Sequence, residues 1–266
     1  MSETVTLSSL KTLLRFPFQG PKWQNSFIIG TVLTFGNFII PIIPLMFVAG
    51  YCLQIMRQAI QGQPLELPEW NDWGKLAVDG IRMLGIGFIY LLPGMVVLIG
   101  GFALYFAGSF TLPFMAAFGQ DNGGPGAAFP LLFLFLLAVF FLSLLLGFVL
   151  YALGAIPLPA ATAHFVAKDH FGSAFQVREW WPLLRVNKLG YLIAFIMVFG
   201  LYYVLSFAVM IAYFTVILCF LIPFLAAPIT FYLALISAAL FGQTYRESQD
   251  LLAPTGPEIE PVAAGI

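Results

Sequence analysis

The sequence predicts an all-α fold, a polytopic membrane helical bundle of about six spans arranged as three hairpins, with both termini cytoplasmic. Three observations predict this class: the composition, the length of the apolar blocks and the placement of the charges. Hydrophobic residues make up 61% of the chain and charged residues 9%, whereas a soluble domain carries about 25% charged residues. We therefore expect the lipid bilayer to be the main partner of this chain.

Residues 1–22 are expected to form an interfacial N-terminal helix. A helix over residues 5–18 would place four leucines on one side and Lys11 and Arg15 nearer the other, as is typical of helices that lie in the membrane surface. The first apolar run begins only near Trp23, and no small-residue cleavage site stands out beyond it. These features predict a retained membrane anchor rather than a removed signal peptide.

The first apolar block, residues 24–61, is interpreted as a helical hairpin that turns at Pro41 and Pro44. As a continuous helix it would be about 57 Å long, close to two crossings of a hydrocarbon core roughly 30 Å thick. A turn of several residues would leave arms barely long enough to cross. A re-entrant hairpin and a single kinked span are therefore alternatives for this block.

Two further hairpins are expected after the first. Helices over residues 76–107 and 129–163 would form the second hairpin, joined by a glycine-rich loop at residues 120–126. Residues 189–245 contain no charged side chain and are long enough for two spans. The turn between these two spans is expected near Cys219–Pro223.

The placement of the charges predicts the orientation. With six spans, all eleven lysines and arginines fall on one side of the membrane, and the other side carries only Asp121. By the positive-inside rule, both termini and the two tryptophan-bearing loops are expected in the cytoplasm. The membrane domain would cover residues 23–246, followed by a disordered tail over residues 247–266. We expect a multi-pass protein of the cell membrane or of another bacterial internal membrane.

Two polar segments between the expected hairpins carry the candidate site residues. One lies at residues 67–74 and the other at residues 168–188, and together they hold four of the five tryptophans. Indole rings at the headgroup level form ordinary interfacial belts, so membrane anchoring is the first interpretation. The functional alternative is a docking face for a protein partner, formed by Glu69, Trp70, Asp72, Trp73, Glu179, Trp180 and Trp181.

Four short motifs carry a resemblance to a known family: Gly50-Tyr51, Leu67-Pro68-x-Trp70-x-Asp72-Trp73-Gly74, Asp79-Gly80 and Tyr90-Leu91-Leu92-Pro93. Over roughly residues 20–245 the chain resembles an uncharacterised prokaryotic integral membrane family, catalogued as domain of unknown function number four thousand and thirteen. The resemblance implies a small multi-spanning membrane protein of bacterial or archaeal type. It carries no established activity, so it assigns no catalytic role to any residue.

The sequence offers little support for catalysis, metal binding or cofactor binding. His164 and His170 are six residues apart, a spacing that does not place both rings on one helical face. An enzyme built on Asp169, His170 and Glu179 would require these side chains to meet within hydrogen-bonding reach. The cations are too dispersed for a nucleic-acid surface. We therefore expect a protein that is not an enzyme and has no catalytic residues, metal, cofactor or nucleic-acid partner.

Two functions from different classes remain. The first is a non-catalytic organising, assembly or docking component that meets a protein partner on its cytoplasmic face; no ionisable side chain lies near the middle of an expected span, which favours it. The second is a channel or carrier for a small neutral or lipid-like molecule, lined by Tyr202, Tyr203 or Ser206. Small residues at helical spacing are compatible with a homo-oligomer in either case.

Overall fold

The computed structural model of the protein describes residues 7–118, 128–213 and 216–253, and the regular structure within these ranges is entirely helical. The predicted all-α class is therefore confirmed. In the described part of the chain, five helices are long and apolar enough to cross a membrane, which suggests a multi-pass membrane protein. These candidate spans are Ile43–Gln61, Trp73–Thr111, Pro130–Lys168, Lys188–Ile211 and Leu221–Leu252.

The chain divides into two compact units. The first unit comprises residues 1–84 and 160–266, and the second comprises residues 85–159. The helices of the first unit are α1 (Leu7–Arg15), η1 (Phe16–Phe18), α2 (Trp23–Gly36), α3 (Ile43–Gln61), the start of α4 (Trp73–Phe118), most of α6 (Leu158–Lys168), η3 (Phe171–Phe175), α7 (Val177–Val186), α8 (Lys188–Tyr213) and α9 (Val216–Leu252). The second unit contains the rest of α4 together with α5 (Ala128–Ala155).

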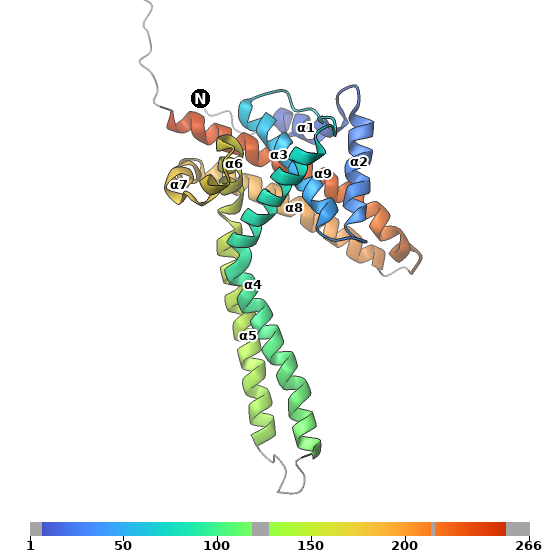
Figure 1. The fold of residues 1–266 in the computed structure, drawn as a ribbon, viewed down its shortest axis with the longest axis vertical. Helices are drawn as coiled ribbons and strands as arrows, with labels where there is room; N and C mark the ends of the chain where they lie inside the picture. Colours follow the sequence, from blue (N-terminus) through green and yellow to red (C-terminus); the bar gives the residue numbers. More distant parts are fainter. Residues whose placement is uncertain (1–6, 119–127, 214–215, 254–266) are drawn as a thin grey trace, which may run out of the picture. The chain divides into compact units, whose positions relative to one another are not determined.

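Helix α9 is the centre of the first unit, because α2, α3, α7 and α8 all pack against it (Figure 1). Its inner side buries Ala227, Phe231 and Leu235, which recur every four residues and so lie along one face of the helix. Small residues allow the closest approach: a methyl group added at Gly242 would lie 2.8 Å from the carbonyl oxygen of Met56 on α3. The α3–α9 contact is therefore a close-packed core between helices distant in the sequence.

A pair of glycines brings α3 and the start of α4 into backbone contact. A Cβ atom added at Gly50 would overlap the carbonyl group of Leu76, and one added at Gly80 would overlap that of Met46. Each glycine thus meets the main chain of the opposite helix, which leaves no room for a side chain at either position. The motif residues Gly50 and Gly80 have a direct packing role.

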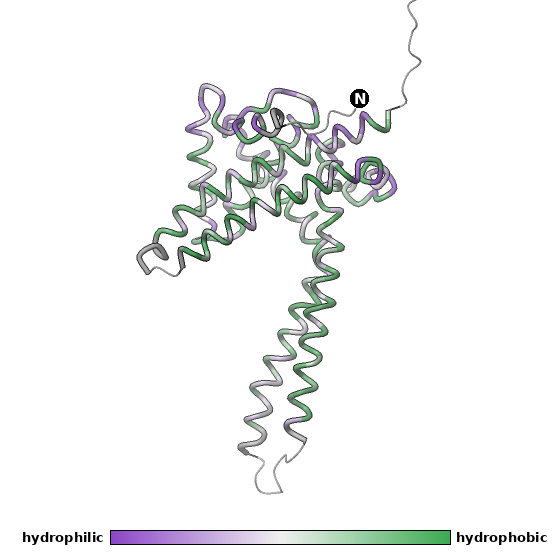
Figure 2. Tube along the Cα trace, turned by 180° about the vertical axis from the view of Figure 1, so that it is seen from behind, coloured by the Kyte–Doolittle hydropathy of each residue, from purple (hydrophilic) through white to green (hydrophobic). Residues whose placement is uncertain are grey.

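The second unit is an antiparallel pair made by α4 and α5. Gly94, Gly101 and Gly108, spaced by seven residues, face the backbone of Tyr151, the side chain of Ser143 and the side chain of Leu136. A seven-residue repeat of contact positions is typical of left-handed helix pairs. Large apolar side chains on the outer faces are exposed, and Figure 2 shows hydrophobic colour along most of α5. Such outer faces are suited to contact with lipid.

The first apolar block breaks where the prolines predicted a turn. Helix α2 ends at Gly36 and α3 begins at Ile43, with Pro41 in the connection and Pro44 in the first turn of α3. Helix α2 has 14 residues and is therefore about 21 Å long, shorter than a hydrocarbon core of roughly 30 Å. It is accordingly absent from the five candidate spans.

Two expected boundaries in the last block are wrong. The turn predicted near Cys219–Pro223 does not occur there, because α9 begins at Val216 and continues through Pro223 and Pro228. Prolines are tolerated inside membrane helices where neighbouring groups satisfy the freed backbone carbonyls. The predicted disordered tail begins too early, since α9 continues to Leu252. Residues 254–266, like the loop predicted at residues 120–126, lie outside the described residues.

The N-terminal helix is part of the first unit. Leu13 and Phe16 are buried, and the hydroxyl of Tyr232 on α9 donates a hydrogen bond of 2.8 Å to the carbonyl oxygen of Leu14. The ring of Phe18 stacks on that of Tyr232 at a centroid distance of 5.7 Å. Residues 11–18 are therefore anchored by protein contacts with α9.

Candidate functional site

The tryptophan of the family-like motif lies in the protein interior. Trp70 is 7% exposed, and its ring is parallel to that of Tyr51, at a centroid distance of 4.1 Å and an interplanar angle of 9°. Its indole N–H donates to the carbonyl oxygen of Ser26 at 2.9 Å, and the Tyr51 hydroxyl donates to that of Pro68 at 2.8 Å. We call Ser26, Tyr51, Pro68 and Trp70 the Trp70 box, which fastens the loop before α4 to α2 and α3.

The other members of the first candidate group lie at the surface around the Trp70 box. Trp73 is 42% exposed and stacks on Trp70 at 5.5 Å. Asp72 caps α4, since its carboxylate accepts a hydrogen bond of 3.0 Å from the backbone N–H of Lys75. Glu69 and Lys22 form an exposed ion pair of 2.6 Å. Hydrogen bonding between these two groups lowers the pKa of Glu69 and raises the pKa of Lys22.

A second polar group, the Arg57 network, connects α3, α4 and the segment after α6. The buried carboxylate of Asp79 lies 3.9 Å from the Arg57 guanidinium and 3.6 Å from that of Arg82. Arg57 also donates to Asp169 at 2.9 Å. Asp169 has a positive φ of 52°, a conformation that aspartate tolerates, in the turn that ends α6. Arg57 therefore stands between two carboxylates that are distant in the sequence.

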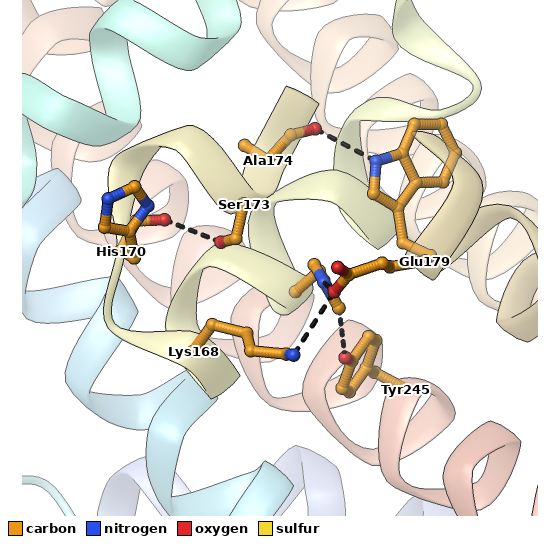
Figure 3. Close-up of polar contacts among 8 residues, drawn as sticks. Lys168, His170, Ser173, Ala174, Glu179 and Tyr245 are labelled. Carbon is orange, nitrogen blue, oxygen red and sulfur yellow. Dashed lines mark hydrogen bonds and ion pairs between the residues drawn. The ribbon is translucent and has the colours of Figure 1, made fainter. Parts of the chain in front are cut away.

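A third group, the His164 cluster, lies where α6, α7 and α9 meet (Figure 3). The buried ring of His164 makes two contacts, from Nδ1 to the Tyr245 hydroxyl at 2.7 Å and from Nε2 to Glu179 at 3.1 Å. The same Glu179 oxygen lies 3.2 Å from the ammonium of Lys168. Hydrogen bonds from Lys168 and then from His164 lower the pKa of Glu179. An ionised carboxylate only accepts, so in the neutral imidazole Nε2 carries the proton and Nδ1 accepts from Tyr245.

The second tryptophan pair repeats the division between inside and outside. Trp180 is 2% exposed, and its indole N–H donates to the carbonyl oxygen of Ala174 at 3.0 Å. Trp181 is 38% exposed, with the guanidinium of Arg185 above its ring at 5.3 Å. Trp70 and Trp180 are thus core residues, and the interpretation of these two as interfacial anchors is wrong because their rings are enclosed by protein. Of the seven predicted docking residues, five are exposed: Glu69, Asp72, Trp73, Glu179 and Trp181.

The three residues of the enzyme alternative are engaged separately. Asp169 bonds to Arg57, whereas Glu179 bonds to His164 and Lys168. The backbone carbonyl of His170 accepts a hydrogen bond of 2.6 Å from Ser173, and its side chain lies at the surface. Within the described ranges no group of three or more histidine, cysteine, aspartate or glutamate residues is placed to hold a metal ion.

Two of the three residues proposed to line a conduit, Tyr203 and Ser206, are exposed on α8, whereas Tyr202 is half-buried. Tyr203 is 75% exposed, which is the orientation expected of a side chain that faces lipid. The hydroxyl of Ser206 donates to the carbonyl oxygen of Tyr202 at 2.8 Å, one turn earlier in the same helix. Helix back-bonding therefore accounts for the polar group of Ser206.

An open groove of about 430 Å³ lies beside the Trp70 box. Eight of its nine lining residues have polar or charged side chains, and the amide oxygen of Gln54 is buried without a hydrogen-bond partner among the described residues. Two of the predicted docking residues, Glu69 and Asp72, line it. The full lining is Gln54, Arg57, Gln58, Gln61, Gln63, Pro68, Glu69, Asn71 and Asp72.

Sequence reasoning missed the partners that these groups meet across the fold. Ser26 and Tyr51 are 44 and 19 positions from Trp70 in the chain, and Tyr245 is 81 positions from His164. No local spacing indicates such pairs. The only signal was the family-like motif, which included Tyr51, Trp70 and Asp79 together.

Comparison with known proteins gives one match. A family model described as "Protein of unknown function (DUF4013)" matches residues 33–214, which include Tyr51, Trp70, Asp79, His164 and Glu179. Neither the curated proteins nor the solved structures contain a match to the chain. The family match covers more than half of the chain and confirms the resemblance carried by the motifs, so the chain belongs to the DUF4013 family of proteins of unknown function.

Proposed function

We propose that this protein is a non-catalytic integral membrane protein that acts as a docking or assembly component. The observation that carries the proposal is the groove beside the Trp70 box. It is open and lined mostly by polar residues, and it is framed by the stacked rings of Tyr51 and the buried Trp70. Such a frame can hold a binding surface in one geometry without taking part in chemistry.

The chemistry of the groove suits an extended polypeptide segment of a partner protein. Four glutamines and Asn71 line it, and each side-chain amide offers both a donor and an acceptor. A peptide backbone presents the same complementary groups in alternation. The buried, unpartnered oxygen of Gln54 supplies an acceptor that a backbone N–H could satisfy.

The ionisable side chains near the groove favour docking over catalysis. Arg57 is held by Asp79 and Asp169, and Glu69 is held by Lys22. Asp72 is occupied in capping α4. These contacts give each charged group a structural role, so the groove is proposed to recognise a partner through neutral amides.

The polar end of the first unit is proposed to face the cytoplasm. Cations from separate parts of the chain form ion pairs there: Lys22 pairs with Glu69, and Arg57 pairs with Asp169. A Cβ atom added at Gly62 would lie 2.6 Å from the Arg246 guanidinium, which brings the end of α9 to the end of α3. Clustering of cations on one side supports a cytoplasmic location under the positive-inside rule.

The docking proposal is tested by filling the groove. Gln61 and Gln63 are exposed at its edge, so the double variant Gln61→Arg/Gln63→Arg adds bulk and charge without disturbing the Trp70 box. Gentle detergent extraction should recover the natural protein in a defined larger complex and the variant without its partner. The matched control, Gln24→Arg on the exposed side of α2, should keep the complex.

Two outcomes would contradict the docking proposal. One is recovery of the natural protein only as a lone monomer or homo-oligomer. The other is a complex whose yield and composition do not change in the groove-filled variant while its thermal stability is normal.

A further inference from the structure

Helix α7 has two distinct sides. Trp180 and Leu183 are buried against the first unit, whereas Val177, Trp181 and Val186 are exposed. The exposed side also carries Arg178 and Arg185. We call Val177, Arg178, Trp181, Arg185 and Val186 the outer face of α7, a face that combines apolar and cationic side chains.

The charges on this outer face have one sign. The only acidic residue of α7 is Glu179, and its carboxylate is engaged by Lys168 and His164 (Figure 3). The remaining charges, Arg178 and Arg185, are followed directly by the exposed Lys188. The outer face therefore presents a cationic surface to whatever covers it.

The position of α7 in the chain ties it to the level of the membrane surface. A single residue, Asn187, separates α7 from α8, and the candidate span of α8 begins at Lys188. The Asn187 side chain fixes this junction, accepting from the backbone N–H of Gly190 at 3.0 Å and donating to the carbonyl oxygen of Thr244 at 3.4 Å. The preceding candidate span ends at Lys168, so both ends of the connection lie next to a span.

Arg185 is positioned for recognition of phosphate. Its guanidinium lies over the ring of Trp181 at 5.3 Å. Such a cation–π contact restrains the planar group and keeps the N–H groups along its edge available as hydrogen-bond donors. Arginine recognises phosphate oxygens through two parallel hydrogen bonds from that edge. An aromatic ring at headgroup depth beside a cation is the arrangement that membrane interfaces favour.

We propose that the outer face of α7 is a binding surface for the headgroups of anionic phospholipids. Val177, Trp181 and Val186 lie against the acyl boundary, and Arg178, Arg185 and Lys188 contact the lipid phosphates. The inward engagement of Glu179 removes the one charge on α7 that would repel them. This surface is separate from the polar groove of the docking proposal and does not depend on it.

The test uses the full chain purified in mild detergent with an equimolar mixture of phosphatidylglycerol and phosphatidylcholine. Retained lipids are counted by native mass spectrometry. The natural protein should be enriched in phosphatidylglycerol, and Arg185→Gln and Arg178→Gln should each reduce the enrichment by about five-fold, the effect of one juxtamembrane cation. Lys75→Gln, which removes an exposed cation near the start of the candidate span of α4, is the matched control: it lies outside the proposed surface and has no aromatic neighbour among its described contacts, so it should change the enrichment much less than either α7 variant.

Thermal stability and competition with inorganic phosphate provide two further measurements. If Arg185→Gln lowers the thermal stability, Arg178→Gln serves alone, because its side chain is exposed at the other end of the helix. Inorganic phosphate added in excess should leave the lipid enrichment in place, since the apolar side chains also hold the lipid. Equal binding of the two lipids, a loss in Lys75→Gln as large as in the α7 variants, or displacement by phosphate alone would each overturn the proposal.

Discussion

The four tryptophans of the polar segments divide into two roles according to single-residue environments. Trp70 and Trp180 have enclosed rings whose indole N–H groups donate to backbone carbonyls, whereas Trp73 and Trp181 lie at the surface. Buried aromatic rings contribute through apolar area, and their polar atom needs a partner. The inner tryptophans are therefore expected to set stability, and the outer ones to meet lipid or a partner.

Replacing Trp70 tests this division. Trp70→Ala removes a buried ring that stacks on Tyr51 and should lower the free energy of unfolding by about 3–5 kcal/mol. Trp73→Ala removes an exposed ring and should cost about 1 kcal/mol or less. Denaturant unfolding of both variants in the same detergent measures the difference. Equal losses would show that the Trp70 box is not a core element.

The Lys22–Glu69 pair predicts a dependence of stability on pH. The pKa of Glu69 lies below its ordinary value of 4.5, so its contribution is present above that pH and is lost as the pH falls through the lower value. The pKa of Lys22 lies above 10.5, so its contribution is present below that pH and is lost as the pH rises through the higher value. The contribution of this pair to the free energy of unfolding should therefore be constant across neutral pH and decrease at both acidic and strongly basic pH.

The variant Glu69→Gln isolates this contribution. It removes the carboxylate, so the difference in thermal midpoint between the natural protein and the variant should be present at neutral pH and shrink on both sides. Because both side chains are exposed, added salt should also shrink it. A difference that stays constant with pH and salt would assign the effect to packing instead of charge.

At the scale of helices, glycine positions decide which elements meet. Gly50 and Gly80 allow α3 and α4 to touch within the first unit, and Gly101 and Gly108 allow α4 and α5 to touch within the second. Within the second unit, Gly94, Gly101 and Gly108 are separated by seven residues and therefore share one side of α4. Glycines thus serve a helix contact in each unit.

Neighbouring glycines on α4 offer a matched comparison. A side chain at Gly101 would overlap Ser143 of α5, whereas a Cβ at Gly100 would meet nothing within 4 Å. Gly101→Leu should destabilise the α4–α5 pair by about 1–3 kcal/mol through overpacking. Gly100→Leu should be neutral or slightly stabilising, since leucine favours a helix over glycine by up to about 1 kcal/mol.

Thermal unfolding and amide hydrogen exchange of the second unit provide the measurement. Faster exchange confined to Gly101→Leu is expected. Identical behaviour of the two leucine variants would mean that the close approach at Gly101 does not contribute to stability.

At the scale of the whole molecule, the first apolar block raises the question of how many times the chain crosses the membrane. Helix α2 is too short to span, and the connection to α3 exposes Phe38, Ile39, Ile40 and Ile42. An apolar turn has a low free energy inside the hydrocarbon region and a high one in water. We therefore propose a re-entrant hairpin, which keeps the N-terminus on the same side as six full spans would.

Cysteine labelling tests the re-entrant hairpin. In a background with Cys52 and Cys219 replaced by serine, a cysteine at Phe38 or Ile40 should resist a membrane-impermeant maleimide added from outside. A cysteine at Asp121, on the loop predicted to face outward, should react from outside. A cysteine at Gln63 should react only after permeabilisation. External labelling at Phe38 would establish a full crossing instead.

The sequence alone determined the helical membrane class, the break at Pro41 and the family. Each rests on local information. Long apolar blocks must be surrounded by lipid or by the protein core, prolines interrupt helices, and the family motifs are contiguous in the sequence. The predictions that were wrong have physical causes as well. Pro223 led us to predict a turn, yet α9 continues through it, since a membrane helix tolerates proline where neighbouring groups satisfy the freed backbone carbonyls.

The tertiary structure decided which side chains are inside and which are outside. Trp70 and Trp73, like Trp180 and Trp181, are equivalent by composition, but α2 and α3 enclose Trp70, and η3 meets Trp180. The pairings of His164 with Tyr245 and of Arg57 with Asp169 likewise join residues distant in the chain. Such contacts depend on how helices pack in space, which no local pattern specifies. A sequence of this kind therefore predicts the class of the molecule, and only packing defines the surface that remains for binding.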